Sequence, residues 1–160
     1  IMVEVFVNMG QIRALKTEGF LTTVGLGSCV GVTMYDAQAK VGVMGHIFLP
    51  KQRPNDRDAL PGKYADTAIP AMIQEALKLG AVKHRLEAKM AGGANLFSNL
   101  NPNSISIGEQ NVIAVREHLQ AAGVPITGQA VQGSHGRKMR FSVADGSVTV
   151  TAIGKTPVRI

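Results

Sequence analysis

The sequence has few of the residues that build disulfides or metal sites. Its 160 residues include no tryptophan and only one cysteine. A single cysteine excludes an internal disulfide and favours a reducing compartment. The histidines lack the spacing of zinc ligands, so we predict no metal site and no cofactor. They are His46, His84, His118 and His135, and the last three are assigned no role.

Long apolar runs are also absent. The longest, Val41 to Leu49, contains His46 and is too short to cross a membrane, so it predicts a buried strand. The first residues show no basic region followed by a long hydrophobic stretch, so no signal peptide is indicated. We therefore expect a soluble, cytoplasmic protein without membrane insertion.

Positive charge exceeds negative charge, with seventeen Lys and Arg against eleven Asp and Glu and a net charge of +6. The basic residues do not alternate with the aromatic side chains on which single-stranded nucleic acids stack. No zinc-finger spacing or recognition helix is present either, so we predict no nucleic-acid partner. A solvated basic surface is the simplest interpretation, and an acidic protein partner is the second. The basic groups are Lys51 to Lys63, Lys83 to Arg85, and Arg137 to Arg140.

Hydrophobic periodicity predicts mostly strands. Helical spacing appears only from Ile69 to Leu77 and from Val112 to Ala122, with Gly80 and Gly123 as stops. The segment 50–62 carries three prolines and predicts a loop, and Asp145-Gly146 predicts a hairpin with a type I′ turn. Strands are expected at 3–7, 21–24, 29–35, 40–49, 86–90, 126–131, 139–143 and 148–152.

This order of elements predicts the fold class. A run of strands, then scattered helices, then more strands suits α+β layers with mixed sheets better than a doubly wound fold. No repeat, linker or low-complexity tract interrupts the chain. We predict a single domain over residues 1–160.

Cys29 and His46 fall in neighbouring predicted strands. If Ala37 and Gln38 form a two-residue turn after Asp36, then Cys29 lies directly opposite His46. An imidazole at that separation can take a proton from a thiol. A slip of one residue would separate the two side chains, so the pairing depends on the register.

The residues before Cys29 fit a catalytic thiol. Gly25 to Ser28 is a glycine-rich turn, and its backbone amides, at Gly27 and Ser28 above all, could point at a developing oxyanion. Thr23 has a hydroxyl that could orient His46. The same pattern also fits a small buried hydrophobe and a satisfied core histidine, and the residues alone leave both interpretations open.

Longer motifs carry a family resemblance. The segments 23–29 (TVGLGSC) and 45–50 (GHIFLP) resemble the CheD family of bacterial chemoreceptor glutamine deamidases. Further similar segments are 63–66 (KYAD), 92–94 (GGA), 107–111 (IGEQN) and Gly136-Arg137 with Phe141. The sequence departs from the family pattern at Met90-Ala91, Gln110 and His135.

The resemblance implies a function. It implies hydrolysis of selected glutamine side chains, in the cytoplasmic domain of methyl-accepting chemoreceptors, to glutamate and ammonia through a thioester on the catalytic cysteine. It places the catalytic triad at Cys29, His46 and Thr23. It also implies a layered α/β/β sandwich like that of the cytotoxic necrotising factor-type deamidases.

The resemblance further implies a partner, the CheC phosphatase, with contacts around Gly92, Gly93 and Phe97. Two alternatives stay open. One is a module that binds receptor or CheC and in which catalysis is secondary. The other is a different cysteine hydrolase, such as a protease or an amidase.

Overall fold

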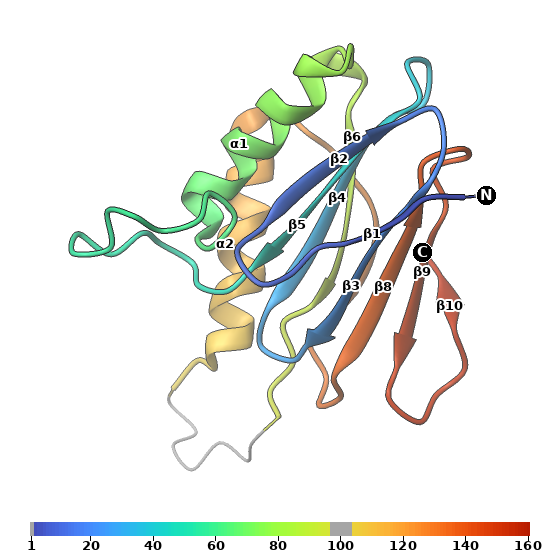
Figure 1. Cartoon of the computed structure of the whole chain (residues 1–160). Coiled ribbons are helices and arrows are strands. Elements are labelled where there is room, and N and C mark those ends of the chain that lie inside the picture. The colour runs from blue at the N-terminus through green and yellow to red at the C-terminus, as the bar shows by residue number, and fades with distance from the viewer. Residues whose placement is uncertain (1, 97–103) are drawn as a thin grey trace.

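Two sheets and two helices form three layers in the computed structural model, which describes residues 2–96 and 104–160 (Figure 1). Helices α1 (Ala65–Lys78) and α2 (Ile107–Ala122) cover one face of the central sheet. The central sheet has the order β2 (Ile12–Lys16), β5 (Val41–Ile47), β4 (Val30–Asp36), β6 (Glu87–Gly92), β7 (Ile126–Val131). The outer sheet has the order β1 (Glu4–Phe6), β3 (Phe20–Leu26), β8 (Arg137–Ser142), β9 (Val148–Ala152), β10 (Val158–Arg159).

Both sheets are mixed. β1 runs parallel to β3 and β6 runs parallel to β7, whereas the remaining neighbours are antiparallel. The prediction of an α+β fold with mixed sheets is therefore confirmed. Within the described residues, no helix is long and apolar enough to cross a membrane.

Two apolar cores separate the three layers. One lies between the helices and the central sheet, and the other lies between the two sheets. Strands β4 and β5 belong to the middle layer, so both of their faces are covered and every residue of β5 is buried. Continuous apolar runs are typical of such strands, as the segment from Val41 shows.

Most predicted strands are present, but two strands were missed. Ile12–Lys16 is an edge strand with Arg13 and Lys16 exposed, and Val158–Arg159 is a two-residue edge strand. Edge strands need only a weak apolar pattern, because one side of each has no neighbouring strand. The β8–β9 hairpin is confirmed, but its turn is not type I′, since only Gly146 of the predicted pair has a positive φ, of 78°.

The predicted register of the β4–β5 hairpin is wrong by two residues. Asp36 pairs with Val41, so His46 lies opposite Gly31 and not opposite Cys29. The cause is a longer turn, in which the Asp36 carboxylate accepts hydrogen bonds from the Gln38 and Ala39 amides. A slip of two residues leaves every side chain on its predicted face, so Cys29 and His46 become diagonal neighbours.

Candidate functional site

The best-defined polar contact between the two sheets joins Thr23 of β3 to His46 of β5. Thr23 Oγ1 lies 2.7 Å from His46 Nδ1 and 2.6 Å from the Val7 carbonyl oxygen, to which its hydroxyl donates. Thr23 and His46 are both buried. The predicted pairing of these two residues is thus present as a short hydrogen bond between facing strands.

This contact fixes which nitrogen of His46 carries the proton. A threonine hydroxyl has one hydrogen, and the Val7 carbonyl accepts it. Nδ1 must therefore donate to Thr23 Oγ1, which leaves Nε2 without a proton and with a free lone pair. Nε2 is buried and has no hydrogen-bond partner in the described part of the chain. An unpartnered buried acceptor is unusual in a stable core and is typical of a proton-transfer site.

Cys29 lies directly before β4, in the core between the sheets, with only 4% of its surface exposed. Burial raises the pKa of its thiol to about 11, although its own backbone amide lowers that pKa slightly. Burial also lowers the pKa of His46, and the Val7 backbone raises it less. At neutral pH Cys29 is therefore a thiol and His46 a neutral imidazole.

Gly31 provides room at the position opposite His46. A Cβ atom there would lie 2.9 Å from Met139 Sδ, 3.1 Å from Leu26 Cδ1 and 3.4 Å from Thr23 Cγ2. Because Gly31 is the residue opposite His46, its missing side chain lets β3 approach the β4–β5 hairpin. Sequence reasoning missed this role, for which the Val30-Gly31-Val32 pattern in a buried strand was the available signal.

Hydrogen bonds to the carbonyl groups of Gly27 and Cys29 hold the turn before Cys29 in place. Gly93 N–H donates to Cys29 O at 2.9 Å and Ala94 N–H donates to Gly27 O at 2.8 Å. The Gly27 amide itself donates to Gly25 O at 3.0 Å. By contrast, the Ser28 amide donates no hydrogen bond within the described residues, and the Cys29 amide contacts only its own thiol, so neither amide is bound to another residue.

Asn111 of α2 is a second residue whose role sequence reasoning missed. Its side-chain amide donates to Ser28 O at 2.9 Å and to Phe48 O at 3.0 Å, and Asn111 is fully buried. It therefore ties the cysteine turn to the segment that follows the histidine strand. Its occurrence in the segment 107–111, one of the family-like motifs, was the signal that marked it.

Two of the three predicted partner-contact residues, Gly92 and Gly93, lie within the described residues, and their contact with a partner stays a prediction. Gly92 and Gly93 are buried, and a Cβ on Gly92 would lie 2.2 Å from Cys29 O, so Gly92 supports the cysteine turn from inside. Gly93 also lines a polar hollow of about 290 Å³ with Asn95 and Glu109. Phe97 lies outside the described residues.

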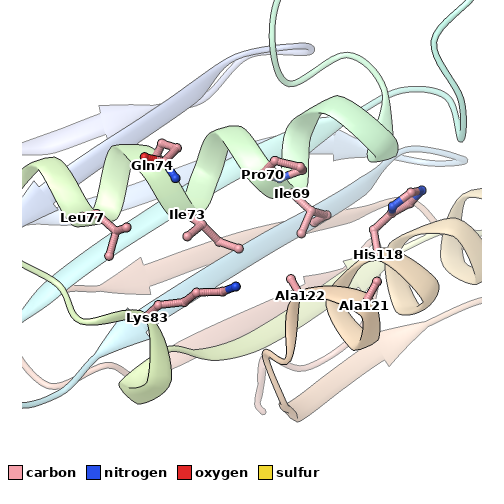
Figure 2. A pocket seen from close by; sticks show the side chains of 9 residues that line it. All are labelled: Ile69, Pro70, Ile73, Gln74, Leu77, Lys83, His118, Ala121 and Ala122. Carbon is pink, nitrogen blue, oxygen red and sulfur yellow. The ribbon is translucent and has the colours of Figure 1, made fainter.

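A separate apolar groove lies on the outer surface of the helices (Figure 2). In this groove, of about 340 Å³, Ile69, Ile73 and Leu77 of α1 face Ala121 and Ala122 of α2. It contains none of the predicted site residues, and the central sheet separates it from the core that holds Cys29. His118 lines this groove, and no group of three metal-binding side chains gathers within the described ranges.

Comparison with known proteins agrees with the motifs. The family model described as "CheD chemotactic sensory transduction" matches residues 48–152. A probable chemoreceptor glutamine deamidase CheD of Caldanaerobacter subterraneus is 44% identical over 149 residues, which are 92% of this chain and 92% of that protein. The chemoreceptor glutamine deamidase CheD of Thermotoga maritima is 39% identical over 148 residues, 92% of this chain and 91% of that protein.

A third relative, a probable chemoreceptor glutamine deamidase CheD of Desulforamulus reducens, is 40% identical over 158 residues, with 98% of this chain and 95% of that protein covered. Similarity of this extent reaches well beyond the cysteine and histidine segments. Together with the family model, it shows that the chain belongs to the CheD family.

Proposed function

We propose that this chain is a protein-glutamine deamidase that acts on chemoreceptors in chemotaxis. The names of the relatives support the reaction, and one structural observation supports the residues that perform it. That observation is the Val7–Thr23–His46 chain of hydrogen bonds, which leaves the buried Nε2 of His46 unprotonated beside the core that holds Cys29. Cys29 acts as nucleophile, His46 as general base and acid, and Thr23 as the positioning residue.

The acylation half-reaction follows from the protonation states. His46 Nε2 takes the thiol proton as Cys29 Sγ forms a bond to the side-chain carbonyl carbon of the glutamine. The oxyanion accepts hydrogen bonds from the Ser28 and Cys29 amides, with Gly27 contributing only if it releases Gly25 O. The imidazolium then gives its proton to the leaving nitrogen, the C–N bond breaks, and ammonia departs from a thioester.

Hydrolysis completes the cycle. Water gives a proton to Nε2 and attacks the thioester carbon, and the S–C bond breaks to yield glutamate and a thiolate that regains the proton. No step needs a metal or an organic cofactor. The high pKa of Cys29, about 11, supports proton removal by His46 during attack over a preformed ion pair.

Several finer points belong to the same proposal. The substrate is the cytoplasmic domain of methyl-accepting chemoreceptors, and CheC is a further partner. The layered α/β/β arrangement is compatible with the fold of the cytotoxic necrotising factor-type deamidases. The reducing cytoplasm suits an enzyme that depends on one free thiol.

One observation favours an alternative function, a receptor- or CheC-binding module with secondary catalysis. Burial keeps the Cys29 thiol protonated, which is the unreactive form of a nucleophile. The alternative predicts that Cys29→Ala leaves receptor signalling intact. The deamidase proposal predicts instead that this variant signals like a strain without the protein.

Mass spectrometry of a receptor cytoplasmic fragment tests the proposal directly. Incubation with the wild-type chain should release ammonia and raise the mass of selected glutamine peptides by about one dalton, and Cys29→Ala and His46→Ala should do neither. Cleaved peptide bonds would instead identify a protease. No ammonia from a cognate receptor fragment at neutral pH would refute the deamidase assignment.

A further inference from the structure

A shallow hollow lies on the open face of the outer sheet, directly beside the cysteine turn. It has a volume of about 370 Å³ and involves the ends of β3, β8 and β9. We call it the β3–β9 shelf and define it by its lining residues: Val24, Gly25, Gly136, Arg137, Lys138, Thr151, Ala152, Ile153, Gly154 and Lys155.

The shelf exposes large apolar side chains to solvent. Ile153 has 74% of its surface exposed and Val24 has 53%. The backbone of Ile153 is held in place, because its amide donates to Gly136 O at 3.0 Å. A large apolar side chain exposed on an ordered backbone is typical of an interaction site.

The charged residues of the shelf all have the same sign. Arg137, Lys138 and Lys155 line it, and none of its described lining residues is acidic. Other cations of the chain have carboxylate partners, for example Arg85 with Asp36 at 3.0 Å and Arg140 with Glu4 at 3.3 Å.

Arg137 differs from these paired cations. Its guanidinium donates to Gly92 O at 3.4 Å, and no ion pair within the described residues includes it. Burial lowers the pKa of Arg137, with no carboxylate to raise it. Its guanidinium thus points toward the central sheet, so the cations that a ligand on the open face meets are Lys138 and Lys155.

The shelf is connected to the catalytic thiol through the backbone. Arg137 pairs with Leu26 across β3 and β8, and Leu26 lies three residues before Cys29. The carbonyl group that Arg137 contacts belongs to Gly92, whose Cα packs against Cys29 O. Val24 and Gly25 line the shelf and lead into the turn that ends at Cys29, so a polypeptide that enters at this end of the two sheets to reach Cys29 would lie beside the shelf.

We infer that the β3–β9 shelf binds the substrate segment beside the target glutamine, and that this segment presents an apolar side chain to Ile153 and Val24 and carboxylates to Lys138 and Lys155. The inference rests on the proposed deamidase function and adds the determinant of substrate choice. Acidic residues near the glutamine raise affinity, and basic residues there lower it.

Variants of Ile153 and Lys155 test the inference, with kcat/KM measured for ammonia release from a receptor cytoplasmic fragment. Ile153→Asp should lower kcat/KM about tenfold, mainly through KM. Lys155→Glu should lower it about fivefold at low salt and less at high salt. Matched controls are Val3→Asp, 57% exposed, and Lys16→Glu, also exposed, both near the other end of the sheets.

The rate of Cys29 alkylation by iodoacetamide separates docking from damage to the site, because this small reagent does not need the shelf. It should stay within about twofold of wild type in all four variants. Equal kcat/KM for Ile153→Asp and Val3→Asp would overturn the inference, as would a parallel loss of alkylation and deamidation. A wild-type chain that releases no ammonia would refute the deamidase proposal itself, and the docking inference would fail with it.

Discussion

The two ends of the β4–β5 hairpin treat a buried polar group in opposite ways. At the turn, the Asp36 carboxylate is fully buried and accepts hydrogen bonds from the amides of Gln38, Ala39 and Val82 and from the Arg85 guanidinium. At the other end, His46 is also buried, but its Nε2 has no partner in the described part of the chain. At one end of this hairpin the buried polar group has hydrogen-bond partners, and at the other end the buried nitrogen has none.

Protonation follows the same division. Burial works to raise the pKa of Asp36, but the Val82 and Ala39 amides and Arg85 lower it overall, so the carboxylate stays charged. Cys29 has no such donors beyond its own amide, and burial raises its pKa to about 11. The difference separates a turn end that stabilises the fold from the opposite end, which holds the proposed base His46 and the proposed nucleophile Cys29.

Removal of the nucleophile should have the largest effect. Cys29→Ala is expected to lower the rate of ammonia release by about 10⁴-fold or more, because no other group in the site can form the thioester. Its free energy of unfolding in urea should stay within about 1–2 kcal/mol of wild type, since the change removes one buried sulfur. If Cys29→Ala lost stability but kept its activity, Cys29 would serve the fold and not the reaction.

At the turn of the hairpin, a change at Asp36 should lower stability and leave activity unchanged. Asp36→Asn leaves the Arg85 guanidinium without its counter-ion and is expected to lower the free energy of unfolding by about 3 kcal/mol. The specific activity of the folded fraction at low temperature should not change. Asp58→Asn, an exposed carboxylate in the 50–62 loop, is the matched control and should have no measurable effect on stability.

The pH dependence of unfolding gives the Asp36 prediction a sign. Because the pKa of Asp36 is lowered in the folded state, its contribution is complete above the unfolded value of about 3.9 and is lost as pH falls through the folded value. Wild type should therefore lose stability in acid more steeply than Asp36→Asn does. Parallel acid titrations of the two proteins would contradict this account of the turn.

Despite the register error, the sequence allowed the faces on which Cys29 and His46 lie to be predicted. Alternation places Cys29 and His46 on one face in any register that differs by an even number of residues, so the wrong turn length did not separate them. What periodicity could not supply were contacts between elements far apart in the chain. Asn111 reaches Ser28 O across 83 residues, and Val7 O accepts from Thr23 across 16.

Turn chemistry explains the error itself. Asp36 was assigned the first position of a two-residue turn, but its side chain satisfies two amides and extends the turn to Lys40, which adopts a positive φ of 52°. Such side-chain-to-backbone bonds compete with the tight hairpin turns that a simple register count assumes. The edge strand Ile12–Lys16 was missed because it forms by pairing with β5, about 30 residues later in the chain, and periodicity does not show such distant contacts.

The reactivity of Cys29 sharpens the comparison further. With a pKa of about 11, its alkylation by iodoacetamide at pH 7 should be about 100-fold slower than that of the guanidinium-unfolded chain, and it should rise about tenfold per pH unit from pH 7 to 9. The unfolded chain is the internal control, since the same thiol then has its ordinary pKa. A rate that is already constant near pH 7 would indicate a preformed thiolate–imidazolium pair.

The Thr23 hydroxyl should make the smallest of these contributions. Thr23→Val keeps the shape of the side chain but removes both the acceptor for His46 Nδ1 and the donor to Val7 O. We expect kcat to fall by about 10–100-fold, because His46 can then adopt the wrong tautomer. Thr23→Ser restores both hydrogen bonds and should recover most of the activity.

A pH profile distinguishes this positioning role from general loosening of the site. Burial is the main cause of the lowered pKa of His46, and Thr23→Val leaves that burial in place. The acid limb of kcat/KM should therefore lie below about pH 6.5 in both proteins, with only the plateau reduced in the variant. A limb that moves up toward that value would mean that water has entered the core, and Thr23 would then act by excluding solvent rather than by holding the imidazole.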